Sequence, residues 1–182
     1  MTLHILHEGI HDKKYFETFI KDDLLKKYEC KSLKARQYKT NEFVSKYIKT
    51  QIELGNICLI FGDADFQNTE AKKPKNYSEL QALLCKKYDI KIDKSKIVFI
   101  IVEEIESWYL AGFDNAFCKK NNVKYYKNTE NVTAEMFADC RIRPEQSEDQ
   151  FRNWLIKNKT EYKIDEAKQR NSSFKVFYDA KE

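Results

Sequence analysis

The first half of the chain alternates short apolar runs with stretches of helical periodicity. Residues 3–7 alternate hydrophobic and polar side chains and run into a turn at Gly9, which predicts a strand. The runs at residues 57–61 and 97–102 are continuously apolar, as expected of central parallel strands covered on both faces. A further strand is expected within residues 30–38, and helices are expected from Asp12 to about residue 28, from Thr40 or Asn41 to Gly55, and over residues 77–88.

This order of strands and helices predicts an α/β fold. Strands that alternate with helices call for a mostly parallel sheet with helices on its faces and right-handed crossovers. After Gly112 the pattern weakens into shorter pieces. We therefore expect an α/β core over residues 1–112 and a C-terminal helical cap or extension over residues 113–182. Its helical pieces are expected near residues 113–121, 133–140, 147–158 and 161–169, with an aromatic closing segment at 174–178.

The composition suits a compact domain with long regular elements. The chain has 182 residues, of which 42% are hydrophobic, and only four are Gly and two are Pro, which argues against a disordered or linker-rich chain. The net charge of +4 permits contact with a phosphate backbone without demanding it. Lys72, Lys73 and Lys75 form a cluster that is a candidate nucleic-acid contact, the alternative being an ordinary solvated surface.

The pattern of cysteines and the length of the apolar runs predict the cellular location of the protein. The five cysteines are scattered, odd in number and never in a C-x-x-C spacing, which indicates neither a zinc site nor a disulfide framework. We expect them to be reduced and mostly buried. No apolar stretch approaches the ~20 residues of a membrane span, and the first residues do not resemble a signal peptide. We therefore expect a soluble, cytoplasmic protein with no membrane partner.

Acidic side chains follow three of the predicted strands at the point where each strand ends. In a parallel sheet these strand ends meet at one edge, where ligands bind. So many carboxylates in one place repel each other unless cations neutralise them, and hard oxygen ligands suit Mg²⁺ or Mn²⁺. Two such ions could activate a water and stabilise the leaving oxygen of a phosphodiester. The candidate ligands are Glu8, Asp12, Asp63 and Asp65, together with Glu103, Glu104 or Glu106, among which the sequence does not choose.

Four short motifs carry a resemblance to a known family. The sequence E-G-I-H-D at residues 8–12 resembles the E-G-x-x-D opening of the Toprim fold, and L-I-F-G-D-A-D at 59–65 resembles its D-x-D strand. The run V-E-E-I-E-S-W-Y-L-A at 102–111 resembles the E-I-E-A-W-L-L-A stretch of small stand-alone OLD-like (overcoming lysogenization defect) Toprim proteins. Their tails often close with N-x-S-F-x-x-F, and N-S-S-F-K-V-F at 171–177 is close to it.

The resemblance implies a Mg²⁺- or Mn²⁺-dependent endonuclease acting on DNA or RNA, often an antiphage enzyme that works beside an ATPase. The chain has no G-x-x-x-x-G-K-[ST] loop, so such an ATPase would be a separate partner. By the same resemblance, Glu8 and Asp12 would hold metal, or Glu8 would act as general acid and base. Asp63 and Asp65 would hold metal, Glu104 or Glu106 would complete the set, and a catalytic lysine near the scissile phosphate would be Lys168 or Lys175.

Several alternatives stay open beside the nuclease. A Toprim-fold module that binds a partner or nucleic acid without catalysis fits the same motifs. The chain is also a candidate to form a homo-oligomer. His4 and His7 should point to opposite faces of one strand and so form no joint site. Trp108 is expected to pack against the sheet rather than to stack on a base, and Trp154 is expected to lie in the core or at an interface.

Overall fold

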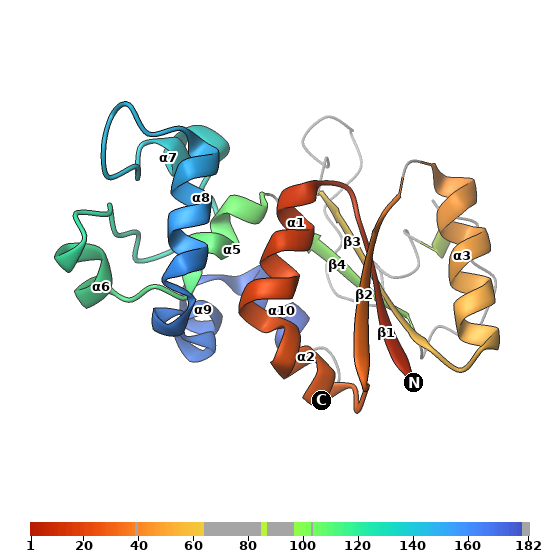
Figure 1. The fold of residues 1–182 in the computed structure, drawn as a ribbon. Helices are drawn as coiled ribbons and strands as arrows, with labels where there is room; N and C mark the ends of the chain where they lie inside the picture. The colour runs from red at the N-terminus through yellow and green to blue at the C-terminus, as the bar shows by residue number, and fades with distance from the viewer. Residues whose placement is uncertain (39, 64–84, 87–96, 103, 180–182) are drawn as a thin grey trace. The chain divides into compact units, whose positions relative to one another are not determined.

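The computed structural model describes residues 1–38, 40–63, 85–86, 97–102 and 104–179, and they fall into two compact units. The first unit is Met1–Ile101 and the second is Val102–Glu182. Figure 1 shows the ribbon of both, and each unit is treated separately below. The lysine cluster at residues 72, 73 and 75 and most of the helix predicted over 77–88 lie outside the described residues.

The first unit is built on a sheet of four described strands in the order β2-β1-β3-β4. Its strands are β1 (Thr2–His7), β2 (Ser32–Gln37), β3 (Ile57–Asp63) and β4 (Ile97–Val102). Strand β1 pairs in parallel with both β2 and β3, so that Leu3 lies opposite Leu33 on one side and Ile57 on the other. The predicted α/β class with a parallel sheet is thus confirmed for these three strands. Strand β4 stands at one end of the described sheet, although its apolar sequence predicted a central place.

Helices cover both faces of this sheet (Figure 1). On one face, α1 (Ile10–Tyr15) continues through a π-helical turn, η1 (Phe16–Ile20), into α2 (Lys21–Lys27). On the other face lies α3 (Asn41–Glu53). The Thr40 hydroxyl accepts the Phe43 N–H at 3.2 Å and so caps α3, as the sequence predicted. Gly55, with φ +76°, ends it in the left-handed conformation that glycine adopts without strain.

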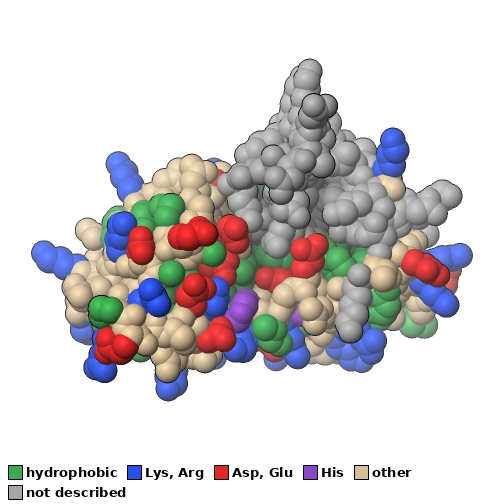
Figure 2. Space-filling view, turned by 90° about the horizontal axis from the view of Figure 1, so that it is seen from above, with side chains coloured by type: hydrophobic (Ala, Val, Ile, Leu, Met, Phe, Trp, Pro, Cys, Tyr) green, Lys and Arg blue, Asp and Glu red, His purple; other side chains and the backbone are tan. Residues whose placement is uncertain are grey.

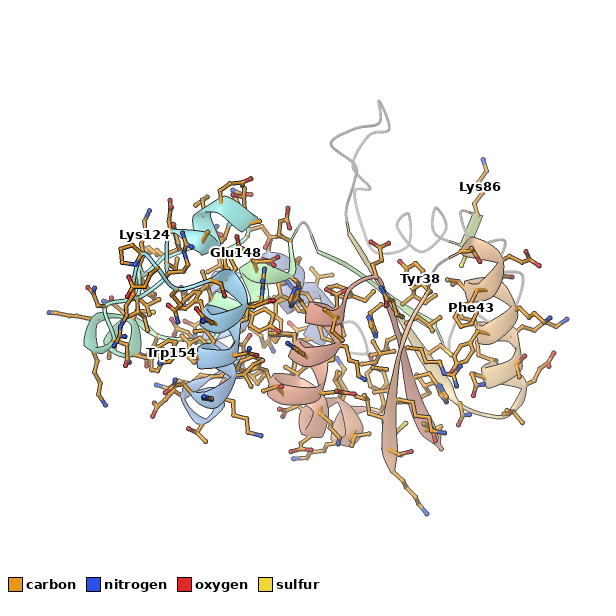
Figure 3. The ribbon with its side chains drawn as sticks, turned by 45° about the horizontal axis from the view of Figure 1, so that its top comes forward. Tyr38, Phe43, Lys86, Lys124, Glu148 and Trp154 are labelled. Carbon is orange, nitrogen blue, oxygen red and sulfur yellow. The ribbon has the colours of Figure 1, made fainter. Side chains whose placement is uncertain are left out.

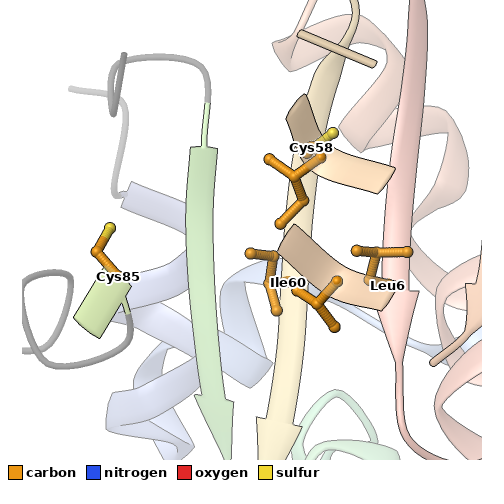
Figure 4. Packing of buried hydrophobic residues seen from close by; sticks show 6 residues of the cluster. Leu6, Cys58, Ile60 and Cys85 are labelled. Atoms are coloured by element: carbon orange, nitrogen blue, oxygen red, sulfur yellow. The ribbon is translucent and has the colours of Figure 1, made fainter. Parts of the chain in front are cut away.

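The alternation along each strand divides the core of the first unit into two layers. Phe61 of β3 packs edge to face on Phe16, with ring centroids 5.0 Å apart, on the side of α1 and η1. Side chains on the opposite face of the sheet pack against α3, and Figure 4 shows part of this layer. Its buried members are Leu6, Val44, Ile48, Cys58, Ile60 and Cys85.

The second unit consists of short helices, as the weak periodicity after Gly112 predicted. They are α5 (Ile105–Ala111), α6 (Asn115–Lys120), α7 (Ala134–Ala138), α8 (Glu148–Lys157), α9 (Ile164–Arg170) and α10 (Ser172–Asp179), with a 3₁₀ turn, η4 (Lys159–Glu161). Helix α5 packs on α7 and α9. The second unit therefore begins at Val102, whereas the sequence placed the boundary after Gly112. None of the helices in the described part of the chain is long and apolar enough to cross a membrane.

Arg170 is the central polar residue of the second unit. Its buried guanidinium donates to the carbonyl oxygens of Leu110 (3.1 Å), Ala111 (3.0 Å) and Phe113, which end α5, and its Nε donates to Tyr126 O at 3.0 Å. A helix end leaves such carbonyls without partners, and the planar guanidinium has enough donors to satisfy several at once. Arg170 thus joins the end of α5 to the segment before α7.

All five cysteines are buried and free, as predicted. Burial raises the pKa of Cys58 to about 12 and that of Cys118 and Cys140 to about 11. At neutral pH these thiols therefore stay protonated, which makes them poor nucleophiles and poor metal ligands.

Candidate metal site at the ends of β1 and β3

Glu8 follows β1 directly and is held by two residues from the end of β2. The Gln37 side-chain amide donates to the backbone oxygen of Glu8 at 2.6 Å, and the Tyr38 hydroxyl donates to Glu8 Oε1, also at 2.6 Å. The Glu8 side chain is half-buried. Figure 3 labels Tyr38, which comes directly after β2. The carboxylate is therefore held in one orientation at the edge of the sheet, and within the described part of the chain no hydrogen bond to its Oε2 is present.

The same tyrosine links Glu8 to the end of β3. The Tyr38 hydroxyl lies 3.2 Å from the carbonyl oxygen of Phe61, which is followed in β3 by Gly62 and Asp63. One hydroxyl group can be this close to both acceptors only if the carboxyl ends of β1 and β3 meet at one edge. The structure thus places the backbone of Asp63 near Glu8. The side chain of Asp63 and the whole of Asp65 lie outside the described residues.

Asp12 lies on α1, one turn from Glu8, and is buried, with 5% of its surface exposed. Its Oδ2 accepts the backbone N–H of Gly9 at 2.7 Å, so the third residue of α1 satisfies the N–H of its N-cap, which as a glycine has no side chain to complete a capping box. The helix begins at Ile10 with Gly9 as its N-cap, two residues before the predicted start at Asp12. The hydrogen bond fixes the carboxylate beside the Gly9 corner.

The histidines near this edge lie on opposite faces of β1, as predicted. On the α3 face, His4 Nδ1 makes a 2.7 Å hydrogen bond with the Tyr47 hydroxyl, and burial together with the charges of Lys34 and Arg36 lowers the His4 pKa. His7 is 2% exposed, and neither of its ring nitrogens has a hydrogen-bond partner of good geometry among the described residues. Burial lowers the pKa of His7 as well, so both rings are neutral at pH 7.

The other described candidates belong to the second unit, and Glu103 lies outside the described residues. Glu106 is buried and its Oε1 pairs with the guanidinium of Arg152, which is equally buried. Lys168 Nζ lies 2.6 Å from Asp179 Oδ1. Glu104 is half-buried at the N-terminal end of α5. The pairing of Glu106 favours a structural role for that residue.

The donors at the first-unit edge fit a hard cation. Glu8 and Asp12 present carboxylate oxygens, without thiolates, which is the chemistry that Mg²⁺ and Mn²⁺ prefer. Among the described residues no group of three or more His, Cys, Asp or Glu side chains lies together, but the predicted ligands Asp63, Asp65 and Glu103 fall outside that search. On the face in Figure 2, basic side chains are scattered over the described surface and do not form one continuous patch.

Sequence reasoning missed Tyr38 and Gln37, which hold Glu8. A signal was present, because both residues lie at the carboxyl end of the predicted second strand. Had that strand been paired beside the first, its last residues would have fallen at the acidic edge.

Comparison of the chain with protein-family models, with curated proteins and with solved structures finds no match in any of the three. The function proposed below therefore rests on the residues, on the resemblance of their motifs and on their geometry.

Proposed function

We propose that the chain is a divalent-metal-dependent nuclease that hydrolyses phosphodiester bonds in DNA or RNA. The observation that carries the proposal is the position of the Tyr38 hydroxyl between Glu8 Oε1 and Phe61 O. This contact supports the meeting of two acid-bearing strand ends at one edge of a parallel sheet. That edge is where α/β proteins bind their ligands.

The proposed ligands of Mg²⁺ or Mn²⁺ are Glu8, Asp12, Asp63 and Asp65. A bound ion would supply an activated water and neutralise charge on the phosphate. The residues of the chain prepare the edge for it: Tyr38 orients one oxygen of Glu8 and leaves Oε2 for the ion or for a proton. The Gly9 N–H fixes Asp12 at the adjacent turn. Orientation of ligands by such hydrogen bonds strengthens metal binding.

The resemblance to the OLD-like Toprim family supports two further parts of the proposal. It favours a role as the effector of an antiphage system, and it favours a separate ATPase as the partner that controls cleavage. By the same resemblance, Glu104 and Lys168 stay candidate functional residues. Glu106 is the weaker candidate, since its carboxylate is paired with Arg152.

A cleavage assay with matched variants tests the function. The full chain is incubated with plasmid DNA, single-stranded DNA and structured RNA in Mn²⁺, Mg²⁺ or EDTA. Glu8→Gln and Asp63→Asn remove proposed ligands with little change in shape. Glu17→Gln is the control, because Glu17 is an exposed glutamate of η1, the next helical turn. Binding of Mn²⁺ is measured by calorimetry on the same four proteins.

The expected result is cutting that needs metal and that Glu8→Gln and Asp63→Asn abolish, with the Glu17→Gln variant unchanged. Metal binding that both ligand variants lose, without any cutting, would place the metal site as proposed and make a partner necessary. Cutting that survives both ligand substitutions would overturn the assignment. Absence of both cutting and metal binding would leave a non-catalytic binding module.

A further inference from the structure

The second unit contains a hollow of about 610 Å³ that has no part in the metal site described above. Its volume falls within the range of small-ligand sites, roughly 300–1,000 Å³. Its walls are α8, the segment between α7 and α8, and Asn121 at the end of α6. The residues that line it are Asn121, Ile142, Arg143, Glu145, Gln146, Gln150 and Trp154.

Trp154 provides an aromatic surface in this hollow. It projects from α8, where Figure 3 labels it, and is half-buried. Its ring packs near Phe117, at 5.6 Å between centroids, and near Phe151, at 6.0 Å. Those two buried rings support the indole, while part of it stays accessible. A supported, half-exposed indole is suited to stacking on a planar ligand.

Three side-chain amides in the hollow are each anchored at one end. Asn121 Nδ2 donates to Phe117 O at 2.9 Å, which leaves its oxygen as an acceptor. Gln146 Oε1 accepts the Ile142 N–H at 3.2 Å, and Gln150 Oε1 accepts the Ser147 N–H at 2.8 Å. Both glutamines therefore keep their NH₂ groups as donors. The hollow thus offers an acceptor and fixed donors around an aromatic ring, which is what the hydrogen-bonding edge of an unpaired base requires.

The wall between α7 and α8 is formed before any ligand arrives. The Arg141 side chain donates to Ala138 O at 2.6 Å and to Gln146 O at 2.9 Å, and the Gln146 N–H donates to Arg143 O at 3.1 Å. These bonds close the segment into a compact turn. Arg143 at its tip is exposed and forms no ion pair within the described part of the chain. A guanidinium in that position is suited to binding a phosphate group.

From these contacts we propose that the hollow binds a nucleobase together with its phosphate, with stacking on Trp154 and the phosphate on Arg143. The choice of single-stranded nucleic acid as the source of that base rests on the proposed nuclease function. A free nucleotide carries the same chemistry. A patch for a protein partner would instead call for a centre depleted of charged side chains, whereas Arg143 and Glu145 both line this hollow.

The test is a binding titration of the full chain in EDTA, so that cleavage does not enter. The chain has two tryptophans, and Trp108 is fully buried, so a ligand that stacks in the hollow quenches the emission of Trp154. The probes are twelve-nucleotide oligomers of dT and dA, a DNA duplex, and AMP and UMP. Affinity is measured separately, from the anisotropy of labelled oligomers.

The variants are Trp154→Leu, Trp154→Phe and Arg143→Gln. Phe43→Leu, at an exposed ring of the first unit, and Lys157→Gln, at an exposed lysine of α8, are the matched controls.

We expect single strands to bind and to quench, with Trp154→Leu weakening binding about tenfold and Trp154→Phe retaining most of it. Arg143→Gln should reduce the slope of log affinity against log salt concentration by about the amount expected of one phosphate contact. Lys157→Gln should leave that slope unchanged. Binding of AMP or UMP without oligomers would support the hollow and identify a free nucleotide as its ligand. Absence of binding by every probe, or equal losses in Trp154→Leu and Phe43→Leu, would overturn the proposal. Because no metal is present in the titration, none of these outcomes depends on whether the chain cleaves nucleic acid.

Discussion

The Tyr38 hydroxyl donates a 2.6 Å hydrogen bond to Glu8 Oε1, so the residue after β2 orients the residue after β1. Parallel pairing of β1 and β2, with His7 opposite Gln37, brings the two residues together. The contact makes Tyr38 a positioning residue for the proposed metal site, since it acts through Glu8.

Tyr38→Phe should weaken Mn²⁺ binding and cleavage about three- to tenfold, because it removes one charge-assisted hydrogen bond without changing the ring. Raising the Mn²⁺ concentration should restore most of the cleavage, as expected of a ligand that is loosened and not lost. Calorimetry and the cleavage rate at several Mn²⁺ concentrations check this. Tyr47→Phe is the control, since the Tyr47 hydroxyl bonds His4, which is not a proposed metal ligand. Equal losses in both variants would contradict a specific role for Tyr38.

The buried histidines of β1 should make the first unit less stable in mild acid. Burial lowers the pKa of His4 and of His7 in the folded chain below the ordinary value of about 6.5. Below that ordinary pKa the unfolded chain takes up protons that the folded chain does not. The contribution of the two neutral rings to the free energy of unfolding is therefore complete above about pH 7. It is lost as the pH falls through 6.5 towards the lowered pKa values of the folded chain.

Urea unfolding between about pH 7.5 and 5.5 checks this prediction. The midpoint of wild type should fall over that interval, and the fall should be smaller in His4→Asn and in His7→Asn. Most carboxylates titrate below this interval and contribute little. A midpoint that is flat with pH in the wild type would show that the two rings are protonated equally in the folded and unfolded chains.

Gly112 in the second unit is required by close packing. A Cβ built on it would lie 2.4 Å from Cζ of Tyr162, whose hydroxyl donates to Trp108 O at 2.9 Å. Gly112→Ala should therefore lower the free energy of unfolding by about 1–3 kcal/mol, the usual cost of overpacking. Urea unfolding of Gly112→Ala measures the cost, and the same substitution in a Tyr162→Ala background should cost much less.

Gly55→Ala offers a contrasting control for that experiment. Gly55 has φ +76° and no atom within 4 Å of a built Cβ, so its substitution costs backbone strain of about 1–2 kcal/mol without a clash. The Tyr162→Ala background should leave this cost unchanged. If Tyr162→Ala relieves neither substitution, the contact at Gly112 is not the cause of its loss.

The parts of the fold that the sequence predicts are those set by local pattern. Apolar runs predict β1 and β3, and the polar residue Thr40 and Gly55 mark the two ends of α3. The pairing of Tyr38 with Glu8 joins residues 30 positions apart, and that of Arg152 with Glu106 joins residues 46 apart. Such contacts depend on which elements pack together, and the periodicity of a single segment carries no information about that.

Two of the motifs that carry the family resemblance are explained by packing in the second unit. The Trp108 indole N–H donates to Ser173 Oγ at 2.9 Å, and its ring packs on Phe174 and Phe177. Asn171 accepts the Phe174 N–H at 2.8 Å and donates to Ser107 Oγ at 3.2 Å. The segments at 102–111 and 171–177 thus hold each other in place. The packing role predicted for Trp108 is confirmed, but the contacts are with α10, whereas the sequence predicted packing against the sheet.

Arg152→Met should cost about 3–5 kcal/mol of unfolding free energy, because it leaves the buried carboxylate of Glu106 without its partner. Adding Glu106→Gln to that variant should recover part of the loss, since the uncompensated charge is then gone. Glu148→Gln is the control: Glu148 also pairs with Arg152, at 3.3 Å, but it is 42% exposed and should contribute at most about 1 kcal/mol. Urea unfolding of the four proteins gives these values.

Calorimetry with Mn²⁺ on Glu106→Gln separates the structural role of Glu106 from a role as a metal ligand. We expect unchanged metal affinity, because the carboxylate is already paired within the second unit. A loss of Mn²⁺ binding without a loss of stability would instead make Glu106 a metal ligand.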